Sequence, residues 1–201
     1  MNKILLLFLA SYLIGSISGS LLLGKFWNID IRNFGSKSAG GTNALRTVGV
    51  FFALLTFIVD LSKGLIPTYI IGYYSNYNEI EMMIGGFAAI IGHVYPIFYK
   101  FNGGKGAATL LGTLIILNPL SLLYVLSIWI ILLVLSGFVG LSTILASLTL
   151  FIYSIIKLDI NFQIFSFLAF LFILFTHKEN IQRMMHQNEN KFTRVMIFRR
   201  K

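Results

Sequence analysis

The chain has 201 residues, of which 57% are hydrophobic without counting glycine and only 11% are charged. A soluble domain carries about 25% charged residues and a larger polar surface than this chain can build. The composition therefore excludes an ordinary soluble domain, a disordered chain and a nucleic-acid-binding module. It predicts an all-α, polytopic integral membrane protein in which residues 1–201 form a single domain.

The formal net charge is +9, from 16 Lys and Arg against 7 Asp and Glu. In a membrane protein such a surplus sets the orientation and attracts anionic headgroups or anionic substrates. The chain has no cysteine, which excludes disulfides, thiolate nucleophiles and Cys-based metal sites.

A helix that crosses a bilayer needs about 20 mostly apolar residues. Six stretches qualify, and they are residues 4–23, 47–74, 82–99, 107–135, 138–156 and 161–176. A cleaved signal peptide is the alternative interpretation of the first. The fourth contains Asn118 and Pro119 in its middle, and proline ends or kinks a helix. Splitting it gives seven spans, of which residues 107–117 make one only about 16 Å long.

Loop charge favours seven spans, with the N-terminus outside and the C-terminus in the cytoplasm. The loops 24–46 and 100–106 and the basic tail 177–201 then face the cytoplasm and hold thirteen of the sixteen Lys and Arg, as the positive-inside rule requires. Six spans would export the tail. In the seven-span topology three helices begin at the cytoplasmic face, near Asn43, Lys105 and Ser142. Three converging helix N-termini would make a strong anion site.

The first cytoplasmic loop, residues 30–46, combines glycines with polar side chains. The glycines allow turns in which backbone N–H groups form an anion-binding concavity. Arg46 adds a bidentate phosphate contact. The predicted phosphate ligands in this loop are Ser36, Gly40, Gly41, Thr42 and Asn43. A flexible connector with a capped helix start is the alternative.

The second loop reads Phe101-Asn102-Gly103-Gly104-Lys105-Gly106. It lacks the spacing of a Walker A loop, but Gly103, Gly104 and Gly106 with the Lys105 cation can still hold a phosphate. An ordinary glycine-rich turn is the alternative.

Polar residues inside the spans and in the tail complete the candidate set. His93 is a functional candidate because ionisable groups within a span are costly, although a hydrogen bond between helices explains it equally well. Asp60 and Lys63 are predicted to neutralise each other in the second span. The tail predicts a helix along the membrane surface, with His177 and Asn180 on one face. A solvated, lipid-binding tail is the alternative. Zinc-protease, nucleophile-elbow and His-x-x-x-x-Asp acyltransferase motifs are absent.

In these motifs the chain resembles the bacterial acyl-phosphate:glycerol-3-phosphate acyltransferases, the PlsY-type family. The resemblance covers four segments in order and spacing, which are Asp30 to Arg46, Asp60 to Gly64, Gly92 to Thr109, and His177 to Ile181. The segment before the sixth helix reads Gly140-Leu141-Ser142-Thr143 where the family has S-L-x-S, and Ser38 replaces the Asn of its G-S-G-N. The resemblance therefore extends to Ser142 and Thr143 as ligands, and not to Gly140 or Ser38.

The resemblance implies a multi-pass enzyme of the bacterial inner membrane whose active site faces the cytoplasm. It implies transfer of a fatty acyl group from acyl phosphate to the 1-hydroxyl of sn-glycerol 3-phosphate, without acyl-CoA. The products are lysophosphatidic acid and inorganic phosphate, at the first acylation of phospholipid biosynthesis. The bilayer and the two substrates are the expected partners. No cofactor, metal, nucleic acid or obligate protein partner is expected.

For this reaction we expect four catalytic residues, Arg46, His93, Lys105 and Asn180. The first loop and the Gly103–Gly104 backbone would hold the acyl phosphate. Arg46 and Lys105 would clamp glycerol 3-phosphate, with His177 and Asn180 contacting it from the tail. His93 either orients a phosphate or acts as base, and a substrate phosphate can itself take the proton. The rival functions are an organic-anion transporter and a non-catalytic lipid-binding protein.

Overall fold

The computed structural model describes residues 3–193 and residue 196, and it divides the chain into two compact units, Met1–Leu117 and Asn118–Lys201. Every regular element in the described residues is helical, so the predicted all-α class is confirmed. The expectation of a single domain stays a prediction. Each unit is described by itself below.

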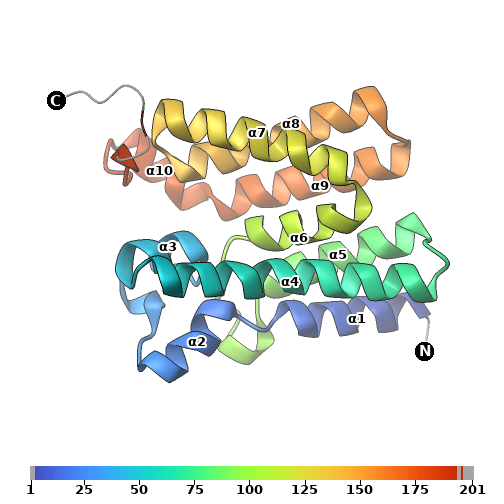
Figure 1. Cartoon of the computed structure of the whole chain (residues 1–201), viewed down its shortest axis with the longest axis horizontal. Helices are drawn as coiled ribbons and strands as arrows, with labels where there is room; N and C mark the ends of the chain where they lie inside the picture. The colour runs from blue at the N-terminus through green and yellow to red at the C-terminus, as the bar shows by residue number, and fades with distance from the viewer. Residues whose placement is uncertain (1–2, 194–195, 197–201) are drawn as a thin grey trace. The chain divides into compact units, whose positions relative to one another are not determined.

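The first unit holds six α-helices and two short 3-10 turns. The α-helices are α1 (Lys3–Gly15), α2 (Gly19–Trp27), α3 (Gly41–Thr47), α4 (Val50–Tyr74), α5 (Glu79–Val94) and α6 (Ala107–Leu117), and the turns are η1 (Ile31–Asn33) and η2 (Ile97–Tyr99). Helix α4 packs against all the other helices of the unit, with α5 in turn against α1 and α6 (Figure 1). The two loops that carry the motifs lead into α3 and α6, and both of these helices pack against α4.

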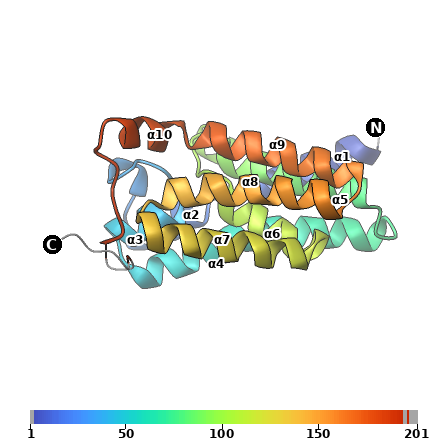
Figure 2. The same ribbon diagram turned by 90° about the horizontal axis from the view of Figure 1, so that it is seen from above.

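The second unit holds α7 (Pro119–Ser136), α8 (Val139–Lys157), α9 (Ile160–Thr176) and α10 (Lys178–Met185). Helix α8 lies between α7 and α9 (Figure 2). The Oγ atoms of Ser154 and Ser166, 2.7 Å apart, join α8 to α9. The helix predicted in the tail is present as α10, and its position along the membrane surface stays a prediction.

Asn118 and Pro119 separate α6 from α7, as predicted. The Asn118 side chain accepts a hydrogen bond from the Ser121 N–H at 2.8 Å, and Pro119 occupies the first helical turn. An Asn N-cap followed by Pro is a typical helix start, so the split has a local cause.

One predicted helix start is wrong, and one predicted span has a break. The first span, predicted over residues 4–23, agrees with a candidate span over Lys3–Trp27, and the helix in it is interrupted between Gly15 and Gly19. The second span does not begin near Asn43, because that residue lies in the separate short helix α3 and α4 begins at Val50. Gly49, with φ of +130°, makes the turn between α3 and α4.

Within the described residues, five helical stretches are long and apolar enough to cross a membrane, or six when α9 and α10, bent by 52°, are counted as one span. Helix α6 is apolar but has only 11 residues. The seventh span thus depends on α6, and seven stays a prediction. The ends of the predicted spans lie within a few residues of the observed ends at α4, α5, α8 and α9.

Glycines let α4 and α6 approach until their backbones touch. A Cβ on Gly64 would collide with the Thr109 carbonyl, and a Cβ on Gly112 would collide with the Leu61 carbonyl. Small residues at such crossings are the usual means of close helix packing in membranes. These two glycine contacts fix the position of α6 along α4. They therefore also fix the position of the loop that precedes α6.

We expect Gly64→Ala to destabilise the protein by about 1–3 kcal/mol, the usual penalty for overpacking. Ile66→Ala, two residues along α4 at a position 45% exposed, is the matched control. Thermal unfolding in detergent measures both. Equal stability of the two variants would contradict the tight α4–α6 contact.

Candidate active site

The first loop is organised around the side chain of Asn43, which is 2% exposed. Its Oδ1 accepts from the Ser36 N–H at 3.0 Å. Its Nδ2 lies 2.9–3.1 Å from three carbonyls of the same loop, those of Ile31, Phe34 and Ser38. Both ends of the amide are therefore occupied. Asn43 was predicted as a phosphate ligand, and the structure instead makes it the residue that holds the loop in shape.

Two hydroxyls of the same loop are better placed for a ligand. Ser36 and Thr42 are half-buried, and their hydroxyls make no hydrogen bond within residues 3–193. The backbone at Gly40 and Gly41 is open, since a Cβ at either would meet nothing closer than 3.8 Å. These four predicted residues remain accessible to a substrate phosphate.

The second loop is tied down through the backbone of its two glycines. The Gly103 N–H donates to the Val94 carbonyl at 3.2 Å, and the Gly104 N–H donates to the His93 carbonyl at 3.1 Å. These N–H groups thus complete the C-terminal end of α5. Both N–H groups are thus occupied within the protein, and a backbone contact from Gly103 and Gly104 to the acyl phosphate stays a prediction. Gly106, with φ of +90°, makes the turn into α6.

The two loops contact each other, as their shared chemistry suggested. The Ala39 N–H donates to the Gly103 carbonyl at 3.1 Å. This bond places the segment 36–46 beside the segment 103–106, and with them the two predicted cations. Arg46, in the last turn of α3, and Lys105, just before α6, are both half-buried. The hydrogen bond therefore joins the two loops in which the phosphate-binding candidates of the first unit lie.

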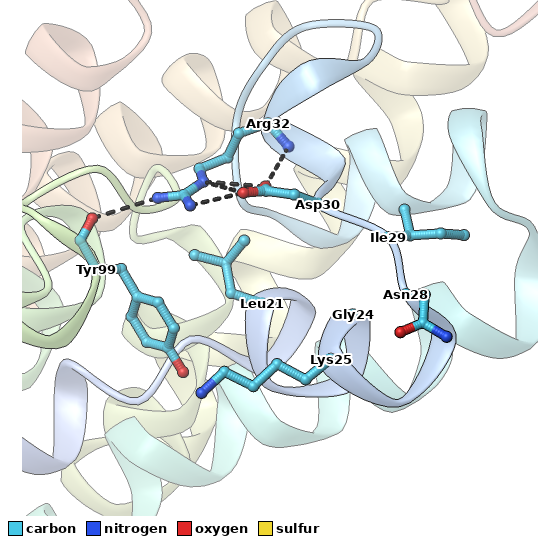
Figure 3. Close-up of a pocket in the computed structure, with 8 residues that line it drawn as sticks. All are labelled: Leu21, Gly24, Lys25, Asn28, Ile29, Asp30, Arg32 and Tyr99. Carbon is cyan, nitrogen blue, oxygen red and sulfur yellow. Dashed lines mark hydrogen bonds and ion pairs between the residues drawn. The ribbon is translucent and has the colours of Figure 1, made fainter.

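A second bridge between the loops comes from Arg32, which was not among the predicted site residues. Its Nε and Nη2 donate to the Asp30 carboxylate at 2.7–3.2 Å, and its Nη1 donates to the Tyr99 carbonyl at 3.3 Å (Figure 3). A fixed guanidinium with an adjacent carboxylate is suited to such cross-links. The motif Asp30-Ile31-Arg32 was the available signal, but its partner on η2 could not be read from the sequence.

A pocket of about 410 Å³ lies beside this bridge. It is lined by Leu21, Gly24, Lys25, Asn28, Ile29, Asp30, Arg32 and Tyr99. None of the predicted site residues lines it, so the pocket is separate from the cluster around Arg46 and Lys105.

His93 is buried, with 4% of its surface exposed. Its Nδ1 lies 3.5 Å from Asp60 Oδ1, and the Nε2 edge of its ring abuts Gly104, where a Cβ would collide with it. Main chain therefore covers the nitrogen that would have to reach a substrate. This arrangement favours the bridging interpretation of His93 over the base. The predicted ion pair of Asp60 and Lys63 is confirmed at 3.0 Å.

In the second unit, two predicted ligands on α8 direct their hydroxyls into the protein. Ser142 is fully buried and donates to the Phe138 carbonyl at 2.9 Å. Thr143 donates to the Val139 carbonyl at 2.8 Å and accepts from the Trp129 indole N–H at 3.1 Å. The Thr143 contact joins α7 to α8. Substrate contact by either residue stays a prediction.

Asn180 is held in the second unit by a carboxylate that sequence reasoning missed. Its Nδ2 donates to Glu189 Oε1 at 3.1 Å, and Glu189 Oε2 accepts from Arg183 Nε at 2.6 Å. Asn180 also packs on Gly140, where a Cβ would lie only 2.8 Å from the Asn180 Cβ. The glycine that departs from the family pattern thus gives Asn180 its place. Glu189 lies outside every motif, so no pattern pointed to it.

His177 caps the end of α9 and is 5% exposed. Its Nδ1 lies 2.8 Å from the Ile173 carbonyl, which leaves Nε2 as the nitrogen for any further partner. Within residues 3–193 and 196, no three His, Cys, Asp or Glu gather as a metal site would require. The arrangement supplies cations and hydroxyls suited to phosphate groups.

The Asp30–Arg32 bridge predicts a pH effect. Hydrogen bonding to Arg32 lowers the pKa of Asp30 below its ordinary value of 3.8, and the same contact raises the pKa of Arg32. The stabilisation is complete above 3.8 and is lost as the pH falls through the lowered pKa. It is small, because 38% of the Asp30 side chain and 26% of the Arg32 side chain are exposed.

Asp30→Asn should accordingly lower the thermal midpoint slightly at pH 7, and the difference from wild type should shrink when the pH is lowered well below 3.8, through the lowered pKa of Asp30. A difference that is unchanged by acid would show that the carboxylate charge is irrelevant to the bridge.

The model of the family described as glycerol-3-phosphate acyltransferase matches residues 5–187. Two curated relatives with that name, from Finegoldia magna and Macrococcus caseolyticus, are 38% and 40% identical over 191 and 190 residues. Each alignment covers 94% of this chain, with 96% and 97% of the respective relative.

The structure resembles two crystal structures of PlsY, described as an integral membrane glycerol 3-phosphate acyltransferase. The glycerol 3-phosphate form gives a TM-score of 0.90 at 31% identity, and the lysophosphatidic acid form 0.88 at 30%. Both comparisons cover 95% of this chain and 96% of the other. The chain therefore belongs to the glycerol-3-phosphate acyltransferase family, as an integral membrane enzyme of the PlsY type.

Proposed function

We propose that the enzyme transfers a fatty acyl group from acyl phosphate to the 1-hydroxyl of sn-glycerol 3-phosphate. The products are lysophosphatidic acid and inorganic phosphate. The observation that carries the proposal is the Ala39–Gly103 bond, which joins two loops that bear Arg46 and Lys105. The ligands named for the two PlsY crystal forms, glycerol 3-phosphate and lysophosphatidic acid, support the acceptor and the product.

Arg46 and Lys105 bind the phosphate of glycerol 3-phosphate in this proposal. Arg46 supplies a bidentate contact and Lys105 a point charge. Ser36 and Thr42, with the open backbone at Gly40 and Gly41, bind the phosphate of the donor. In the second unit, Asn180, His177, Ser142 and Thr143 are retained as predicted ligands.

The chemistry requires little from the protein beyond positioning, because an acyl phosphate is a mixed anhydride with a good leaving group. The 1-hydroxyl oxygen attacks the acyl carbon, the new ester C–O bond forms, and the bond from that carbon to the phosphate oxygen breaks. The released phosphate takes the hydroxyl proton. This route suits a buried His93 and agrees with catalysis by orientation and fixed charge.

The site faces the cytoplasm in this proposal, at the inner membrane of a bacterium. The support is the distribution of Lys and Arg, which fall mainly in the loops 24–46 and 100–106 and in the tail. That orientation requires α6 to cross as a short seventh span, in locally thinned bilayer.

The proposal is tested by phosphate release from palmitoyl phosphate by the purified protein in lipid, with and without glycerol 3-phosphate. Acyl-CoA and acyl-carrier protein serve as alternative donors. We expect release that depends on glycerol 3-phosphate, together with lysophosphatidic acid. Acylation from acyl-CoA alone would refute the donor assignment.

Arg46→Ala should reduce kcat/KM for glycerol 3-phosphate by about tenfold to a hundredfold, as expected for the loss of a charged hydrogen bond. Arg46→Lys should recover part of this, since the charge returns without the second donor. Lys25→Ala, an equal change of charge at an exposed position on α2, is the control. Wild-type turnover by Arg46→Ala would refute the clamp.

A further inference from the structure

The break in the first span leaves backbone groups without helical partners inside a buried part of the first unit. Helix α1 ends at Gly15 and α2 begins at Gly19, and the Ser18 side chain makes no capping bond. Unpaired backbone groups are costly within a membrane. The central helix α4 supplies the partners. Lys63 Nζ donates to the Ile17 carbonyl at 2.8 Å, and the Gly19 N–H donates to Asp60 Oδ1 at 3.3 Å.

This ion pair is almost wholly buried, with 4% of the Lys63 side chain and 2% of the Asp60 side chain exposed. Replacing a buried ion pair by apolar residues is often neutral or stabilising. A gain in stability is therefore a weak reason for placing two charges here. The arrangement around Asp60 points to positioning instead.

Asp60 is linked to the chain on both sides of Lys105, through its carboxylate on one side and its backbone carbonyl on the other. On one side its carboxylate faces His93 Nδ1 at 3.5 Å. The His93 carbonyl accepts from the Gly104 N–H, and the His93 ring abuts Gly104. On the other side the Asp60 carbonyl accepts from Thr109 Oγ1 at 2.9 Å. The chain between Gly104 and Thr109, which holds Lys105, is thus anchored at both ends to one residue of α4.

We propose that the Asp60 side chain, together with Lys63, is a positioning residue for Lys105, fixing the ammonium group against the acceptor phosphate through His93 and Gly104, while the Asp60 backbone carbonyl holds Thr109. The expected effect on kinetics rests on the proposed role of Lys105 in binding the acceptor phosphate. The claim that Asp60 holds the second loop in place does not rest on the proposed function.

The structural part is tested with a spin label, because the chain has no cysteine and a single introduced one is labelled cleanly. Asn102→Cys places the label on an exposed residue of the second loop, and Glu79→Cys places a control label at the exposed start of α5. The background variant is Asp60→Asn/Lys63→Met, which removes both charges and leaves neither one buried alone. We expect faster label motion at 102 with no change at 79. Unchanged motion at 102, in protein that still elutes as folded, would overturn the proposal.

The kinetic part uses the same double variant with and without Lys105→Ala. In wild-type background we expect kcat/KM for glycerol 3-phosphate, per folded molecule, to fall about tenfold to a hundredfold, as small displacements of a binding group do. In the Lys105→Ala background the double substitution should cost nothing further, since groups that act as a unit are not additive. Losses that multiply would show a general structural role and overturn the positioning route.

Asp60→Glu provides the conservative comparison. It keeps the carboxylate and should recover more activity than Asp60→Asn, whereas equal activity of the two would contradict a role for the charge. If the enzyme proves not to use glycerol 3-phosphate at all, the spin-label comparison still decides whether Asp60 fixes the loop. Failure of the proposed function and failure of the positioning role are therefore distinguishable.

Discussion

Every backbone N–H and C=O that lies within a bilayer needs a partner inside the protein, and the first unit meets this constraint at its least regular places. At the break between α1 and α2, Lys63 donates a hydrogen bond to the Ile17 carbonyl and Asp60 accepts one from the Gly19 N–H. The end of α5 is completed by the N–H groups of Gly103 and Gly104. Irregular backbone is thus tolerated where a neighbouring element supplies the missing bond.

The same bonds determine which groups are left for chemistry. Asn43 and the N–H groups of Gly103 and Gly104 make hydrogen bonds within the protein. The groups that we propose to bind phosphate are the Arg46 and Lys105 cations and the hydroxyls of Ser36 and Thr42. A site of this kind is preorganised, because its loops are fixed before any substrate arrives. That is the condition under which orientation and fixed charge accelerate a reaction most.

Most of the fold could be predicted from the sequence because length and hydropathy decide where membrane helices lie. Asn118 and Pro119 marked the start of α7 for reasons local to the chain. The break after Gly15 was not predicted because serine and glycine are common within membrane helices, and the groups on α4 that stabilise the break cannot be read from the sequence. The separate helix α3 was missed because Gly49 was the only signal for the turn after it.

The sequence pointed to the residues of the candidate site, but it could not predict which groups each residue contacts. Gly-rich loops with Arg46 and Lys105 predicted phosphate chemistry. Whether an amide or N–H group faces substrate or its own chain depends on tertiary contacts, so the bonds that Asn43 and Gly103 make within the protein could not be predicted. Glu189 could not be found at all, since only the fold brings it to Asn180.

The central claim is that the second loop is held by its own backbone and binds phosphate through side chains. Amide hydrogen exchange at Gly103 and Gly104, measured with and without glycerol 3-phosphate, tests it most directly. We expect both amides to be protected in the free enzyme and their exchange to be unchanged by glycerol 3-phosphate. Fast exchange in the free enzyme that slows when glycerol 3-phosphate binds would show that these amides contact the substrate, and would contradict the account.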